Sequence, residues 1–182
     1  INILTKEHLT KKGIMSCQLN ECDSILMSYI LENKLLNSLT NEEIIPILSI
    51  FINEGNKSDD ILYLEDINIP KNIKEIIKKI NNINKEIEEK SLKYNIIYNF
   101  EPYYSFLEHS FLWCKEKNIK EILNITQSNI YEGNFIKNII KINNICTEII
   151  ETLKIINEFE LIEKLNHISK ILIRDIIQTP SI

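Results

Sequence analysis

The chain has 182 residues and a mass of 21.4 kDa, enough for one large domain or two small ones, and its 44% of hydrophobic residues suffices for a sizeable core. A charged fraction of 26%, with only three Gly and four Pro, excludes a collagen-like or wholly disordered protein. The net charge of -5 argues against strong autonomous nucleic-acid binding, because free-standing binders usually carry a basic domain or stripe.

No run of about 18 apolar residues occurs, so we expect no segment that spans a membrane. No secretory signal pattern follows Ile1, and the first residue is not Met, so the sequence fits either a fragment of a longer protein or a free-standing chain. The cysteines Cys17, Cys22, Cys114 and Cys146 form no C-x-x-C pair, and the three histidines are scattered. We therefore expect reduced thiols and no bound metal.

In chain order, residues 1–20 are predicted to be a linker segment from a preceding domain, with a tight turn at 9–13 and a short extended run at 14–19. Residues 21–182 are predicted to be all-α, an irregular helical bundle of about six to eight helices. The polar, turn-prone stretch 53–70 is the predicted variable loop, where an insertion would be tolerated.

The first half of the bundle carries clear helix signals. An apolar stripe predicts a helix near 22–35. Thr40-Asn41-Glu42-Glu43 fits a capping box, in which the Thr hydroxyl and the Glu carboxylate accept hydrogen bonds from free amides at a helix start. Pro46 falls inside the helix that follows, where it removes one backbone hydrogen bond and is expected to cause a kink.

A long helix is predicted over 71–97 from a heptad seam that Lys90 breaks once. Two rows of residues lie seven apart: Ile73, Ile80, Ile87 and Tyr94, and Ile76, Ile83, Lys90 and Ile97. This heptad seam fits either a helix lying across a bundle, which we favour, or a coiled coil with a partner protein. Further helices are predicted at 102–117, 118–124, 132–157 and 158–178.

Recognisable catalytic chemistry is missing. The sequence contains no P-loop, no G-x-G-x-x-G turn and no H-E-x-x-H motif. Acid pairs such as Glu42-Glu43 and Glu88-Glu89 fit solvated helix surfaces better than a general acid/base couple. The chain by itself is therefore predicted to be non-catalytic, and no cofactor is expected in it.

The order of several short motifs resembles the C-terminal helical domain of the exosome-associated DExH-box RNA helicases of the superkiller and nuclear messenger-transport type, called the DSHCT domain. The resemblance covers about 9–182. It rests on Leu9-Thr10-x-Lys12-Gly13, Asp23-Ser24-Ile25-Leu26, Leu39-Thr40-Asn41-Glu42-Glu43-Ile44, Leu48-Ser49-x-Phe51, Trp113, Tyr131-Glu132-Gly133-Asn134-Phe135-Ile136-Lys137 and Ile173-Arg174-Asp175-Ile176-Ile177.

The resemblance implies a domain of an ATP-dependent 3′-5′ RNA helicase of exosome-linked RNA processing or decay, forming part of the RNA channel. ATP and Mg would belong to the parent motor domains. The implied partners are single-stranded RNA, bound weakly by this chain alone, the helicase's own RecA-like and winged-helix domains, and exosome adaptor subunits. A monomer is expected, nuclear or alternatively cytoplasmic. The alternative function is a non-catalytic adaptor that binds protein through the 71–97 seam.

By resemblance, the helix that begins at Glu132 is a "ratchet" helix that touches the translocating strand, with Lys141 and Asn144 at RNA-facing positions. The spacing of Lys137, Lys141, Asn144 and Glu148 independently puts them on one helix face, with isoleucines around most of the remaining girth. Lysines can meet phosphates, and an amide can bond a base edge or a sugar hydroxyl. An ordinary solvated stripe is the alternative.

Three residues are predicted structural anchors: Arg174, Trp113 and Gly133. Arg174 is expected to tie the last helix to a carboxylate or to carbonyls at a helix end, with an RNA contact as its alternative role. Trp113 is expected in the core rather than stacked on a base. The chain departs from the family at Glu116, where relatives have Gly, and at Tyr29, where a Glu is common.

Overall fold

The computed structural model describes residues 8–53, 62–174 and 176. Within these ranges the chain is all-α, with no strand, which confirms the predicted fold class. The elements are α1 (Lys11–Gln18), α2 (Ser24–Glu32), α3 (Asn41–Ser49), the 3-10 helix η1 (Leu64–Asp66), α4 (Lys71–Leu92), α5 (Leu107–Cys114), α6 (Ile119–Thr126), α7 (Glu132–Ile155) and α8 (Ile162–Leu172).

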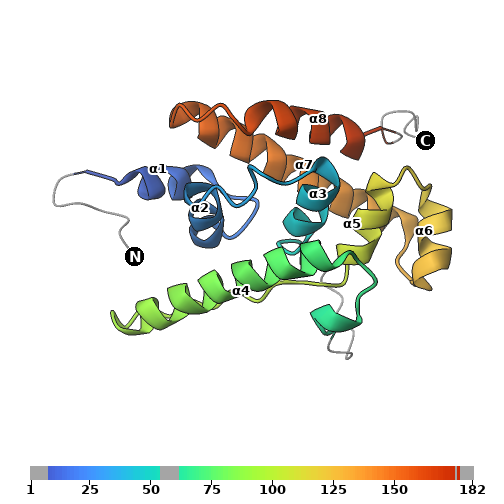
Figure 1. Cartoon of the computed structure of the whole chain (residues 1–182), viewed down its shortest axis with the longest axis horizontal. Coiled ribbons are helices and arrows are strands. Elements are labelled where there is room, and N and C mark those ends of the chain that lie inside the picture. Colours follow the sequence, from blue (N-terminus) through green and yellow to red (C-terminus); the bar gives the residue numbers. More distant parts are fainter. Residues whose placement is uncertain (1–7, 54–61, 175, 177–182) are drawn as a thin grey trace.

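The helices are arranged around α3. Figure 1 shows α7 and α8 side by side along one edge of the molecule, α4 along the opposite edge and α3 between them. The pair α1 and α2 lies at one end, and α5 with α6 lies at the other. Because α3 is covered by α4, α5, α7 and α8, six consecutive residues from Ile44 to Ser49 are buried. A helix that is apolar on nearly all sides belongs in such a central position.

Side-chain caps define where several helices begin. The backbone N–H of Thr40 donates to Glu43 Oε2 at 2.8 Å within the predicted capping box, which is confirmed. A second capping box, which was not predicted from the sequence, begins α6, where the side chains of Asn118 and Glu121 accept hydrogen bonds from each other's backbone N–H groups. Pro46 does lie inside α3. The kink there stays a prediction.

The tight turn predicted at 9–13 and the extended run predicted at 14–19 are wrong, because α1 spans Lys11–Gln18. The Thr10 hydroxyl accepts a hydrogen bond from the Gly13 N–H at 3.1 Å and caps the helix. Met15 and Leu19, four residues apart, are 0% and 3% exposed. Their shared buried face favours a helix over a strand.

Two predicted helix boundaries are also wrong. The helix predicted to reach residue 97 ends at Leu92, because Asn95 adopts a φ of 55° and the Ile96 N–H turns back to the Ser91 carbonyl. The helix predicted from residue 102 begins at Leu107. Before it, the Tyr103 N–H donates to the Ile50 carbonyl at 2.9 Å, so tertiary contact replaces the first helical turn.

The predicted variable loop at 53–70 falls partly outside the described residues. Its later part packs onto the core, since Leu64, Ile67 and Ile69 are each at most 9% exposed. The last predicted helix, 158–178, spans Ile162–Leu172, and residues 177 and 178 lie outside the described ranges.

The heptad seam packs inside this chain. Ile73, Ile80 and Ile87 are at most 1% exposed, and α4 contacts α2 and α3. Tyr94, the last position of the seam, lies beyond the helix and is 70% exposed. In the second row, Ile76 and Ile83 are partly buried against the same core, whereas Ile97 lies beyond the helix and is 93% exposed. The seam therefore packs mainly within the bundle.

Candidate nucleic-acid interface

The long helix α7 has one buried flank and one open flank. Its 24 residues give it a length of about 36 Å. The buried flank packs between α1, α3 and α8. It consists of Phe135, Asn138, Ile139, Ile142, Ile145, Cys146, Ile149, Ile150, Thr152 and Leu153.

The open flank carries the stripe predicted from the sequence. Lys137 and Lys141 are exposed, and Asn144 is half-buried beside them. Ile140 is 40% exposed, so the open flank is wider than the narrow polar stripe that the sequence indicated. The three predicted RNA-contact residues therefore share one accessible face of α7.

Lys141 lies next to the start of the variable loop. Its Nζ is 3.5 Å from the carbonyl oxygen of Asn53, a long and exposed contact. Such a contact leaves the ammonium group hydrated, with further donors available to a phosphate.

Glu148, the fourth residue of the predicted stripe, has a structural role. Its Oε2 accepts hydrogen bonds from the backbone N–H groups of Asn20 and Glu21, both at 2.8 Å. These bonds hold the connection between α1 and α2 against α7. The sequence spacing correctly placed Glu148 on the same face as the lysines. Its hydrogen-bond partners could not be predicted, because they lie more than 120 residues away in the sequence.

The charge on the open flank changes sign along the helix. Lys137 and Lys141 occupy the N-terminal half, whereas Glu148 and the exposed Glu151 outnumber the exposed Lys154 in the C-terminal half. A polyanion approaching this flank would therefore be attracted at the N-terminal half and repelled near the other end.

Aromatic residues support the N-terminal half of α7 from beneath. The Phe135 ring lies 5.1 Å from that of Phe106 and 5.5 Å from that of Trp113. His109 stacks on Phe106 at 5.5 Å, and Thr126 Oγ1 is 3.1 Å from its Nε2. Burial lowers the pKa of His109 to about 4, so the ring is neutral near pH 7. Scattered histidines in the sequence gave no hint of this cluster.

The predicted anchors have different surroundings. Trp113 is 1% exposed, and its Nε1 donates to the Leu172 carbonyl at 3.3 Å. The Arg174 guanidinium lies 4.2 Å from the centre of the Trp113 ring, and its Nη2 donates to the Lys117 carbonyl at 2.9 Å. These contacts join the end of α8 to the end of α5. At Gly133 an added Cβ would meet no heavy atom within 4 Å, so packing supplies no reason for glycine there.

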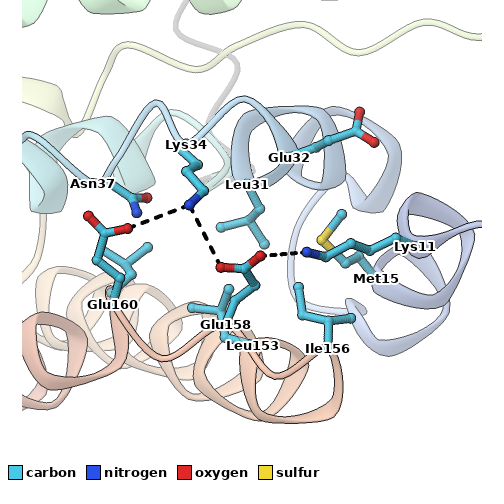
Figure 2. A pocket seen from close by; sticks show the side chains of 11 residues that line it. Lys11, Met15, Leu31, Glu32, Lys34, Asn37, Leu153, Ile156, Glu158 and Glu160 are labelled. Atoms are coloured by element: carbon cyan, nitrogen blue, oxygen red, sulfur yellow. Dashed lines mark hydrogen bonds and ion pairs between the residues drawn. The ribbon is translucent and has the colours of Figure 1, made fainter.

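A small pocket lies away from this helix face, where α1, α2 and the α7–α8 turn meet. Figure 2 shows Lys11 and Lys34 both directed at Glu158, with Lys34 also directed at Glu160. The corresponding N–O distances are 2.6, 3.8 and 3.7 Å. The cavity volume is about 50 Å³, far below the several hundred Å³ of a small-molecule site. The ion pairs therefore join three elements around space for a few waters.

Other kinds of site are missing from the part of the chain that the structure describes. No three His, Cys, Asp or Glu side chains gather there in a way that would hold a metal ion. None of the helices in those ranges combines the length and the hydropathy needed to cross a bilayer. Among the described residues, we therefore take the open flank of α7, with its two exposed lysines and Asn144, as the candidate functional surface.

The fold and this surface define an all-α helical domain with one long, partly cationic helix face. A family model described as the DSHCT (NUC185) domain matches residues 6–179, and the chain belongs to this family. The family predicted from the sequence motifs is thereby confirmed.

Several full-length proteins are similar to the chain. It is 22% identical over 173 residues to the "ATP-dependent RNA helicase mtr4" of Schizosaccharomyces pombe. The matched region covers 94% of this chain and 15% of that protein. It is 22% identical over 154 residues to the human "Exosome RNA helicase MTR4", covering 84% and 14%. For "mRNA transport homolog 4" of Caenorhabditis elegans the identity is 21%, with coverage of 96% and 17%. The chain thus spans about a sixth or less of these relatives.

Proposed function

We propose that this chain is the C-terminal helical-bundle domain of an ATP-dependent 3′-5′ RNA helicase, and that it forms part of the helicase's RNA channel. Family membership and the similarity to exosome RNA helicases support the assignment to a helicase. The observation that carries the channel role is the accessible face of α7 with Lys137, Lys141 and Asn144.

The proposed role of this face follows from its chemistry. Two ammonium groups contact successive phosphates as point charges, while the Asn144 amide bonds a sugar hydroxyl or a base edge. The phosphate contacts and a sugar-hydroxyl contact read no defined sequence, which suits a motor that must move along any RNA. The net charge of -5 and the glutamates further along α7 make binding by this chain alone weak.

The remaining functions of such a protein belong to other parts of the polypeptide. ATP and Mg would bind the RecA-like motor domains, because this chain contains no P-loop. The domain would pack against those motor domains and the winged helix, and the parent protein would work with exosome adaptor subunits in RNA processing or decay. We propose a nuclear location, with the cytoplasm as the alternative, on the ground of the resemblance to the nuclear messenger-transport helicases.

Charge reversal on α7 tests the channel role. In the full helicase, Lys141→Glu is expected to reduce both RNA unwinding and RNA-stimulated ATPase, since it repels the phosphate that Lys141 attracts. Lys154→Glu is the matched control, because Lys154 is an exposed lysine of the same helix near its other end. If both activities of Lys141→Glu stay within about twofold of wild type, a difference of less than roughly 0.4 kcal/mol, Lys141 has no channel role.

A further inference from the structure

A short series of contacts links Lys141 to two residues outside α7. The Lys141 Nζ lies 3.5 Å from the backbone carbonyl oxygen of Asn53, which follows the end of α3. The side-chain Nδ2 of the same asparagine donates to the hydroxyl of Tyr103 at 2.9 Å. Both contacts are exposed, and Tyr103 lies in the connection before α5. At Lys141, the open flank of α7 therefore continues onto the end of α3 and the segment that leads to α5.

The positions of Asn53 and Tyr103 are fixed by buried neighbours. The Tyr103 N–H donates to the Ile50 carbonyl at 2.9 Å, and Phe51 and Ile52 are buried directly before Asn53. Tyr103 itself is half-buried, so neighbouring atoms support part of its side chain. Groups held on a fixed backbone lose less conformational entropy when they bind a ligand.

The Tyr103 hydroxyl has a proton available for donation. A phenol carries one proton and can also accept hydrogen bonds. This hydroxyl accepts from Asn53, and no acceptor among the described residues receives its own proton. Tyr104, the next residue, is directed elsewhere, since its hydroxyl accepts from Asn81 of α4 at 2.7 Å. Helix α4 runs along the edge of the molecule opposite α7 (Figure 1).

We propose that Tyr103 is a further RNA-contacting residue, whose hydroxyl donates to the phosphate backbone of the strand held at Lys141, and that Asn53 positions this hydroxyl. This inference rests on the proposed function. The ammonium group and the phenol contact atoms of one asparagine, so a strand held at Lys141 passes beside Tyr103. A backbone phosphate accepts hydrogen bonds and donates none, which suits a site where both groups have protons to donate. Because every nucleotide carries a phosphate, the contact adds affinity without a sequence preference.

The test measures binding of single-stranded RNA, and of DNA with the same sequence, to the full helicase. Tyr103→Phe removes only the hydroxyl and is expected to weaken binding of both strands roughly three- to tenfold, since both carry phosphates. The slope of log affinity against log salt is expected to stay unchanged, because the lost group carries no charge. Tyr104→Phe is the matched control and should bind as wild type does, because its hydroxyl contacts α4.

The Asn53→Ala variant separates a direct contact from an indirect one. If Tyr103 touches the strand, adding Tyr103→Phe to Asn53→Ala weakens binding further. If Tyr103 acts only by holding Asn53, the second substitution has no further effect, and the proposed contact is wrong. A loss on RNA without a loss on DNA also overturns the phosphate contact, because the hydroxyl would then bind a ribose 2′-OH.

Lys141→Ala separates this inference from the proposed function. It is expected to reduce the slope of log affinity against log salt by about 0.7, one phosphate contact on a single strand. If Tyr103→Phe binds both strands as wild type does while Lys141→Ala lowers the slope, the contact by Tyr103 is wrong and the channel role stands. If neither substitution changes binding, both the contact by Tyr103 and the channel role are wrong.

Discussion

Glu116 occupies a backbone conformation that is costly for a residue with a side chain. Its φ is 59°, in the left-handed region, at the turn that follows α5. The resemblance to the DSHCT family implies a glycine at this position, and glycine adopts this conformation without a Cβ clash. The substitution therefore leaves local strain of about 1 kcal/mol in the folded chain.

Replacing Glu116 by glycine is predicted to stabilise the protein. We expect Glu116→Gly to raise the free energy of unfolding by about 1 kcal/mol, or roughly 2–4 °C in Tm for a domain of this size. Asn157→Gly is the control, since Asn157 has a φ of 56° but asparagine tolerates this region better. Thermal unfolding of the three proteins measures the effect. An equal or larger gain for Asn157→Gly would contradict the strain assigned to Glu116.

Tyr29, where the family resemblance implies a Glu, takes part in a contact between α1 and α2. Lys12 Nζ lies 3.4 Å from the centre of the Tyr29 ring and 2.6 Å from Glu32 Oε2. Lys12 is only 9% exposed, so its charge is satisfied by a cation–π contact together with an ion pair. Lys12, from the motif Leu9-Thr10-x-Lys12-Gly13, thus joins α1 to α2.

His109 is predicted to make stability depend on pH. Burial lowers its folded-state pKa from 6.5 to about 4, so between these values the unfolded chain binds more protons than the folded one. Stability is therefore lost as pH falls from 6.5 toward 4, by about 3 kcal/mol from this group at most. Urea unfolding at several pH values measures the slope for wild type and for His109→Gln.

The His109→Gln variant is expected to lose this part of the pH dependence, whatever its stability at pH 7. Carboxylates titrate in the same range, so the difference between the two slopes is the quantity that matters. His167→Gln, at an exposed position of α8, serves as the control and should retain the wild-type slope. If the unfolding free energy depends on pH with the same slope in wild type and in His109→Gln, burial does not hold His109 neutral.

Among the elements, α7 connects the core to the candidate interface. One flank packs on three helices, while the other leaves its lysines accessible. Glu148 bonds the backbone of residues 20 and 21 and so places the α1–α2 connection beside that open flank. Glu148, which the sequence spacing placed in the predicted RNA-facing stripe, therefore positions the segment that lies beside that stripe.

Removing the Glu148 carboxylate is predicted to loosen the α1–α2 connection. We expect Glu148→Ala to lower the free energy of unfolding by about 1–2 kcal/mol, because two charge-assisted hydrogen bonds at a partly exposed site are lost. Amide hydrogen exchange should become faster at Asn20 and Glu21, whereas Glu151→Ala, one turn away on the exposed surface, should leave it unchanged. Unaltered exchange in Glu148→Ala would contradict the role of Glu148.

Much of the element pattern is predictable from local signals, and particular contacts explain the rest. The capping-box residues Thr40 and Glu43 predict the start of α3 from the sequence alone. By contrast, the start of α5 depends on the bond from Tyr103 to Ile50, and the stacking of Phe100 on Phe51 at 5.2 Å holds the same segment. These contacts link residues about 50 positions apart, which hydrophobic periodicity does not report. The Lys137–Lys141 face was predictable for the opposite reason, since its members share one helix.

At the scale of the whole molecule, a single core holds the α4 seam, the α7 flank and the central helix α3. The seam that the adaptor alternative requires is occupied by this chain's own helices at Ile73, Ile80 and Ile87. Sedimentation of the isolated chain is therefore expected to give a monomer across micromolar concentrations. A stable dimer that is lost in Ile97→Glu, at the 93% exposed residue beyond α4, would instead support the adaptor.

The most direct measurement is crosslinking between α7 and RNA in the working helicase. A photoreactive amino acid is placed at position 141 or, as a control, at position 154 of the full protein, which is then irradiated on single-stranded RNA. The account predicts a strong RNA crosslink from position 141 and little from 154, because only the former lies in the cationic half of the open flank. Equal crosslinking at both positions, or none at 141, would contradict the proposal that this face of α7 contacts RNA.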